Sequence, residues 1–316
     1  RPAASSFTER LALQEPVCEV LGWLWDTITG PVLERLSLTT PVPAGARPPR
    51  IWWCPQGPLS FLPLHAAGYH GPRADPDRPR CALAMAASSY APTIAALHHA
   101  RQQPEPADDG GRGPLLVAMS RTPGATPLAS AGAEMRKVRE CLGTAVRPVE
   151  LADQEATTER VLQAMRQARS VHLACHAVAD PQDPSASRIL TYDHKQRPLT
   201  VTDVAGLRLT GADLAFLSAC ATSRTRQELA DEAIHITGAF QLAGFRNVVG
   251  TLWPVGDEAA SQLAETFYRA LARHRRTEDG STGDASALAL HSAVTALHNR
   301  YLWFPALWAS HVHVGA

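Results

Sequence analysis

Short apolar runs separated by amphipathic segments dominate the second half of the chain. Five runs have the length and composition of buried strands, at residues 115–119, 170–176, 213–220, 247–253 and 310–315. Apolar positions at helical spacing predict helices over residues 130–143, 157–168, 228–244, 257–274 and 284–299. This alternation is typical of βαβ units, so we predict an α/β fold in which helices cover both faces of a mostly parallel central sheet.

The first half of the chain is patterned differently. Apolar positions at helical spacing over residues 7–38 predict helices, and a Pro/Gly/Arg-rich break at 40–50 precedes the strand-like run IWWC at 51–54. The following segment, PQGPLSFLPLHAAG, indicates a turn and a second, proline-edged strand. A polar loop at 101–114 is the best candidate boundary, so we predict an N-terminal helical and β-hairpin subdomain at 1–112 and a larger subdomain at 113–316.

Composition narrows the classes of partner. Thirty basic and thirty acidic residues cancel among 316 residues, so the charge balance predicts neither nucleic acid nor an anionic membrane as a partner. The most apolar stretch, at 81–97, is short and broken by Ser, Tyr and Pro, and no signal peptide is visible. The chain begins at Arg1 and not at Met, which indicates a piece of a longer protein.

Six cysteines are scattered without a C-x-x-C pair, which is typical of reduced thiols in a cytoplasmic protein. His172 and His176 form H-x-x-x-H, but on a strand these side chains lie about 13 Å apart, so we predict no metal site. No G-x-x-x-x-G-K-[ST] phosphate loop occurs, and we predict no cofactor.

Two of the predicted strands carry groups suited to nucleophilic catalysis at their carboxyl ends. His176 ends the strand SVHLACH and Cys220 ends the strand DLAFLSAC. Two strands of one parallel sheet would deliver such side chains to one rim, where an imidazole can deprotonate a thiol. Alternation directs Cys175 into the core, and we interpret His172 as a satisfied core histidine or a supporting neighbour of the site.

The motifs VHLACHA and LAFLSACATS, with 44 positions between His176 and Cys220 (220 − 176), resemble the CHAT domain family of caspase-like, separase-related cysteine peptidases. A spacing of about 50 residues separates the same pair in caspases. Further segments are similar to the family in the same order. They are IWWCPQGPLSFLPLHAAG, SSYAPTIAAL, DEAIHITGAFQLAGFRNVVGTLWPVGDEAA, ALHSAVTAL and PALWASHVHVG.

The resemblance implies a caspase-like α/β/α sandwich with a smaller N-terminal half that resembles a pseudo-protease. It implies a cysteine endopeptidase that cleaves a regulatory protein substrate, with His176 as the catalytic histidine and Cys220 as the nucleophile. The backbone amides of Ala177 and Cys220 would form the oxyanion hole. Ala177 stands where the family commonly has Gly. No third orienting residue is evident, so we predict a dyad.

The resemblance also suggests a specificity pocket. Asp257 occupies a position where separase-like relatives carry an acid that receives an Arg side chain, although it could instead cap the helix that it precedes. Asp231 and Glu232 form a second acidic pair, which could equally interact with a helix dipole. Trp253 would line the pocket or fill the core.

Members of the family often lie at the C-terminus of sensor or repeat-containing chains, so regulatory N-terminal domains or an activator protein are expected partners. Two alternatives stay open. The first is a catalytically silent caspase-like interaction module, and the second is a cysteine hydrolase that acts on a small molecule. A peptidase needs an open groove beside an exposed strand, whereas the small-molecule enzyme needs a closed pocket.

Overall fold

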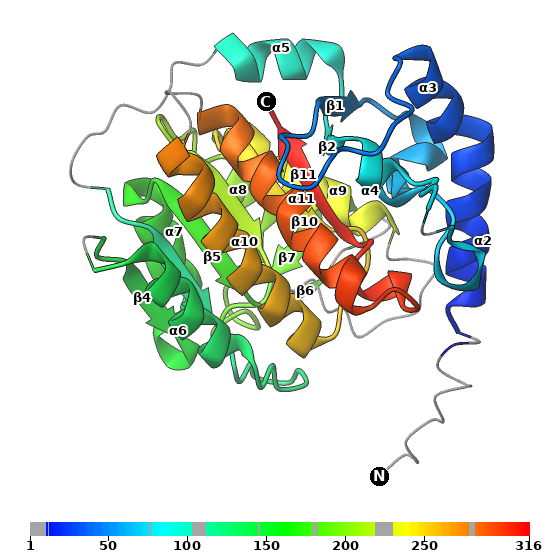
Figure 1. The fold of residues 1–316 in the computed structure, drawn as a ribbon. Helices are drawn as coiled ribbons and strands as arrows, with labels where there is room; N and C mark the ends of the chain where they lie inside the picture. The colour runs from blue at the N-terminus through cyan, green and yellow to red at the C-terminus, as the bar shows by residue number, and fades with distance from the viewer. Residues whose placement is uncertain are drawn as a thin grey trace.

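A computed structural model describes residues 11, 13–75, 77–102, 112–144, 146–178, 180, 183–218, 230–277 and 282–316. Its centre is an eight-stranded sheet with the order β1-β2-β11-β10-β9-β5-β3-β4 (Figure 1). The strands are β1 (Arg50–Trp53), β2 (Ala87–Tyr90), β3 (Leu115–Ala118), β4 (Val149–Ala152), β5 (Ser170–Ala174), β9 (Leu214–Leu217), β10 (Asn247–Thr251) and β11 (His311–Gly315). Among these strands only the β10–β11 pair is antiparallel. The predicted α/β fold with a mostly parallel sheet is therefore confirmed.

Helices cover both faces of the sheet. In Figure 1, α10 and α11 lie in front of it, and α8 and α9 lie behind it. The long helices of the second half are α6 (Ala131–Leu142), α7 (Thr158–Gln167), α9 (Ala230–Ala243), α10 (Asp257–Thr277) and α11 (Thr282–Arg300), with a short α8 (Val201–Ala205). The apolar periodicity at 130–143, 157–168, 228–244, 257–274 and 284–299 predicted these five long helices correctly.

The core is packed around the middle strands. Phe216 on β9 is fully buried, stacks on the ring of His172 from β5 at 5.1 Å, and contacts Phe267 of α10 at 4.9 Å. Burial of both faces requires an apolar side chain at every position of β3 and β9, which is why these strands read as continuous apolar runs.

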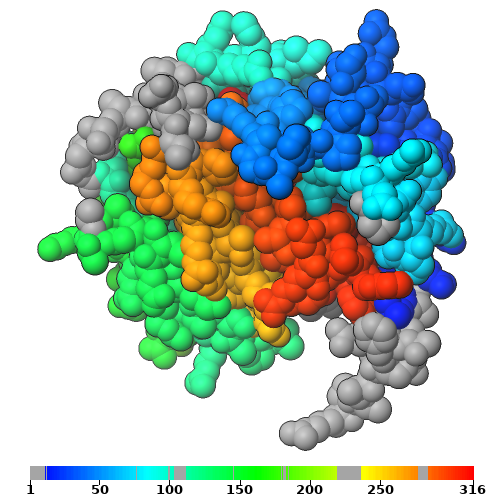
Figure 2. Space-filling view, in the orientation of Figure 1, coloured from blue at the N-terminus to red at the C-terminus, as the bar shows by residue number. Residues whose placement is uncertain are grey.

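The first half contributes helices and one edge of the same sheet. Helices α2 (Glu15–Leu24) and α3 (Gly30–Arg35) are joined by a π-helical turn at Trp25–Thr29, and α5 (Ile94–Gln102) follows β2. Other short helices include α4 (Ala82–Met85). Within the sheet, β1 and β2 join the strands of the second half through β11. A groove of about 870 Å³ separates the segment 41–48 from α10 and α11, and Figure 2 shows the segment beside these helices.

One predicted short strand was wrong, and a small sheet was missed. The segment 55–68 does not form the predicted second strand, because Gly57–Phe61 and Leu64–Ala66 form 3-10 turns and the partner of β1 is β2. A small three-stranded antiparallel sheet of β6 (Ala177–Val178), β7 (Arg188–Ile189) and β8 (Leu199–Thr200) was not predicted. Strands of two residues are too short to show periodicity.

Candidate active site

His176 lies two residues beyond the end of β5, at the carboxyl rim of the parallel strands, as the sequence predicted. Its side chain is only 4% exposed. Its Nε2 lies 2.7 Å from the backbone carbonyl oxygen of Thr126, in the loop that joins β3 to α6. A carbonyl only accepts hydrogen bonds, so Nε2 carries a proton and Nδ1 is the basic nitrogen of the neutral ring.

The Thr126 carbonyl supplies an orienting partner that the sequence did not reveal. A backbone oxygen has no side-chain signature, and 50 positions separate the two residues. A hydrogen bond of this kind selects one tautomer of a catalytic histidine and fixes its ring, which is the task of the third member in a catalytic triad.

Cys220 lies outside the described residues. The strand that leads to it, β9, pairs in parallel with β5, so the prediction that both strands belong to one parallel sheet is confirmed, and the structure shows that they are neighbours. Leu173 is opposite Leu217, and the amide of Ser218 donates to the carbonyl of Leu173 at 3.0 Å. The two strands therefore end at the same level of the sheet.

Ala177 begins β6 directly after the histidine and is buried. It faces Ile189 of β7, and the amide of Leu190 donates to the carbonyl of His176 at 2.8 Å. In an antiparallel pair this bond marks a non-hydrogen-bonded position, so the amide of Ala177 points away from β7.

Asp257 is half-buried at the first position of α10. Its Oδ2 accepts a hydrogen bond from the backbone amide of Ser130 at 2.7 Å, across 127 positions of sequence. Ser130 directly precedes α6, but its own side chain makes no capping hydrogen bond. The Asp257 carboxylate therefore stabilises the start of a neighbouring helix, where negative charge is favourable.

The remaining predicted pocket residues lie in two places, between β10 and α10 and in α9. Trp253 is half-buried, and its indole nitrogen donates to the carbonyl of Ala306 at 2.9 Å. Asp231 and Glu232 lie in α9, but their side chains are not among those described.

A second buried pair lies beneath the rim. His172 is fully buried, and its Nε2 is 2.9 Å from Oε1 of Glu134, which is 2% exposed. The hydroxyl of Tyr268 lies 3.3 Å from Nδ1 of the same ring, and burial raises the pKa of this phenol. This confirms the interpretation of His172 as a satisfied core histidine. Cys175 is also buried, as predicted.

Within the part of the chain that the structure describes, no group of three or more His, Cys, Asp or Glu side chains has the arrangement of a metal site. The described helices also include none with the length and apolar character needed to cross a bilayer.

Comparison with known proteins gave one family match. The model of the CHAT domain matches residues 19–316. No curated protein matched the chain. Among solved structures, separase in the Saccharomyces cerevisiae separase–securin complex is similar over 81% of this chain and 14% of its own, with 11% identity and a TM-score of 0.49. The Arg-specific cysteine proteinase gingipain R is similar over 72% of this chain and 53% of its own, with 12% identity and a TM-score of 0.43. Since both TM-scores are below 0.5, we draw nothing about activity from either structure.

Proposed function

The chain belongs to the CHAT domain family, and from this premise we propose that it is a caspase-like cysteine endopeptidase with a His176–Cys220 dyad. The observation that carries the proposal is the hydrogen bond from Nε2 of His176 to the Thr126 carbonyl. It leaves Nδ1 as the base, at the rim where the neighbouring strand leads into Cys220.

Chain connectivity supports the pairing of these two residues. β5 and β9 are adjacent parallel strands, which lie about 4.8 Å apart. His176 is two residues beyond Ala174, and Cys220 is two residues beyond Ser218. Two extended residues span at most about 7 Å, so chain connectivity allows the two side chains to meet and supports the proposed pairing.

The chemistry follows from these roles. Nδ1 of His176 accepts the thiol proton, and Sγ of Cys220 attacks the scissile carbonyl carbon. The amides of Ala177 and Cys220 stabilise the oxyanion, and the amide of Ala177 points away from its strand partner. His176 then returns the proton to the leaving amine, and water hydrolyses the thioester.

We propose that the substrate is a regulatory protein cut after a basic residue. Asp257 is half-buried at the start of α10, and its carboxylate can accept further hydrogen bonds besides the one from the Ser130 amide. Asp231 and Glu232 would add negative charge, and Trp253 would form a wall. The chain would act as the effector domain of a larger protein, under the control of N-terminal domains or an activator.

Covalent labelling tests this function. Wild-type chain and the variants Cys220→Ala and His176→Ala are treated with peptidyl acyloxymethyl ketones that carry Arg, Asp or Leu next to the reactive group. We expect one adduct on wild type, with Arg preferred, and none on either variant. Cys18→Ala is the matched control, since burial raises the pKa of the Cys18 thiol and makes it a poor nucleophile. An adduct that persists in Cys220→Ala would refute the assignment.

The same experiment separates the alternatives. An interaction module forms no adduct with any probe, even when the longer protein and its activator are present. A small-molecule hydrolase reacts with a compact electrophile such as iodoacetamide in preference to every peptidyl probe, because a closed pocket excludes a peptide.

A further inference from the structure

We infer that His194 positions His176 through the loop of residues 120–130, and this inference rests on the function proposed above. Both imidazoles donate a proton to backbone carbonyls of this loop. Nε2 of His176 donates to Thr126 at 2.7 Å, and Nε2 of His194 donates to Pro123 at 2.9 Å. The two contacts are three positions apart, so the second histidine holds the segment that orients the first.

The bond from His194 depends on the shape of one turn. The amide of Ala125 donates to the carbonyl of Thr122 at 3.1 Å, with Pro123 and Gly124 as the central residues. Gly124 has a φ of +84°, which identifies a type II turn. In this type the carbonyl of the first central residue points to the opposite side from that in a type I turn, because ψ there is about +120° instead of about −30°. Thr126 follows the turn directly.

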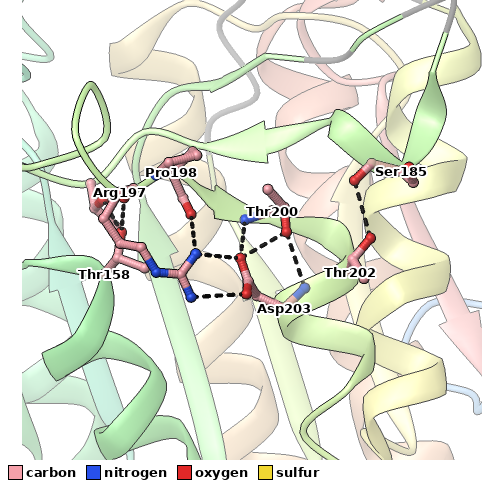
Figure 3. A network of polar contacts seen from close by, with 8 residues as sticks. Thr158, Ser185, Arg197, Pro198, Thr200, Thr202 and Asp203 are labelled. Atoms are coloured by element: carbon pink, nitrogen blue, oxygen red, sulfur yellow. Dashed lines mark hydrogen bonds and ion pairs between the residues drawn. The ribbon is translucent and has the colours of Figure 1, made fainter.

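His194 itself sits on a rigid segment. Its neighbour Asp193 accepts a hydrogen bond from the amide of Thr158 at 2.8 Å, at the start of α7. Arg197, three residues later, forms two hydrogen bonds with Asp203, at 3.0 and 3.2 Å. Figure 3 shows this pair, with the side chain of Thr158 beside the backbone of Arg197. The network ties the segment 191–200 to α7 and α8, so His194 is supported by two helices.

The loop is also fixed near its ends. The amide of Arg121 donates to Asp153 at 2.8 Å, and the amide of Ser130 donates to Asp257 at 2.7 Å. Neither of these two hydrogen bonds involves residues 122–125, which form the turn. Without the His194 donor, we expect the turn to change type and the Thr126 carbonyl to rotate.

Rotation of the Thr126 carbonyl would change the tautomer of His176. With the Thr126 carbonyl as acceptor, the proton stays on Nε2 and Nδ1 can accept the thiol proton. When that acceptor moves away, the tautomer protonated on Nδ1 becomes populated, and this form cannot accept a proton at the same atom. A hydrogen bond of this kind is worth about 1 kcal/mol, which corresponds to a reactivity change of about 3- to 10-fold.

Two readouts test the inference on His194→Ala, His194→Gln and Gln196→Ala. Nitrogen-15 shifts of labelled histidines, with the signal of His176 assigned from His176→Gln, report the tautomer without need of catalysis. The second-order rate of adduct formation at Cys220 reports reactivity. We expect His194→Ala to populate the Nδ1–H tautomer and to react about 3- to 10-fold more slowly. His194→Gln should recover most of both values, since its Nε2 can donate at a similar reach. Gln196→Ala, an exposed change in the same segment, should match wild type.

A second pair of variants guards against misfolding of His194→Ala. Gly124→Ala should rotate the Pro123 carbonyl and reproduce the tautomer change, whereas Gly45→Ala should not. Gly45 has a φ of +81° in an exposed loop, so both variants carry the same backbone strain. Wild-type tautomer populations in both His194→Ala and Gly124→Ala would overturn the inference. Absence of an adduct on wild type, even with the longer protein and its activator present, would refute the proposed function alone, because the tautomer measurement still decides the role of His194.

Discussion

Acid should unfold this protein well before its carboxylates titrate, because several buried histidines cannot accept a proton in the folded state. Burial lowers the pKa of His65 and His311 to about 3 and that of His70 and His291 to about 4. In the unfolded chain each has a pKa near 6.5. Below pH 6.5 the unfolded state therefore binds protons that the folded state does not, and the free energy of unfolding falls from about pH 6.5 down to about pH 3 to 4.

The size of the effect follows from the number of protons. Each extra proton that the unfolded chain binds lowers the free energy of unfolding by up to about 1.4 kcal/mol per pH unit. For four histidines, the free energy of unfolding therefore falls by close to about 5 kcal/mol per pH unit between pH 6 and 5. At pH 5 the loss is up to about 2 kcal/mol per histidine. The total is comparable with the 5–15 kcal/mol of stability typical of a domain, so we expect unfolding near pH 5.

Urea titrations followed by circular dichroism at pH 7.5, 6.5, 6.0 and 5.5 measure the slope. His311→Asn removes one titrating group, so the slope of the free energy of unfolding against pH should fall by about 1.4 kcal/mol per pH unit. His98→Asn, an exposed change on α5, is the control. Asp203 and Glu265 also have lowered pKa values, but their contribution is lost only below about pH 4.5, outside this window. A slope below 1.4 kcal/mol per unit between pH 6.5 and 5.5 would refute the reasoning.

Three further predictions concern stability. Phe216→Ala removes a fully buried ring, so we expect a loss of about 3–5 kcal/mol in urea unfolding, and a loss below 1 would contradict the packing described. Gly244→Ala forces a φ of +113° on alanine and brings its Cβ to 2.3 Å from the Leu209 carbonyl oxygen. We expect the free energy of unfolding to fall by about 2–3 kcal/mol, and an unchanged melting temperature would be inconsistent with that contact. Asp213→Asn weakens the 2.6 Å ion pair with half-exposed Arg275, so the free energy of unfolding should fall by about 1–2 kcal/mol. The difference should persist in 0.5 M NaCl because Asp213 is buried, and its disappearance there would count against a buried pair.

The sequence predicted elements wherever periodicity had room to develop. The runs at 115–119 and 170–176 became β3 and β5, because a strand buried on both faces needs an uninterrupted apolar sequence. β2 was missed, because its sequence, ASSY, carries two serines. Ser89 is buried, and its hydroxyl bonds with His313 from β11, so this position depends on a partner 224 positions away.

The residues of the candidate site also differ in whether the sequence could predict them. His176 was predicted because its residue type and its position after a strand are both visible in the sequence. Thr126 and His194 were not predicted, because the first acts through its backbone and the second acts on the backbone of another segment. The carboxylate of Asp257 was singled out, but its bond with Ser130 joins two helices whose relative position no local pattern encodes.

The position of β11 between β2 and β10 has a consequence for synthesis on the ribosome. β1 and β2 emerge early, but β11 is the strand that joins them to the rest of the sheet, and 220 residues lie between Tyr90 and His311. At about 5–20 residues per second, roughly 10–40 s pass before β11 is made. During that interval β2 and β10 each have an unpaired edge, and such edges are where aggregation begins. Nascent chains should therefore depend on chaperones until the last strand closes the sheet.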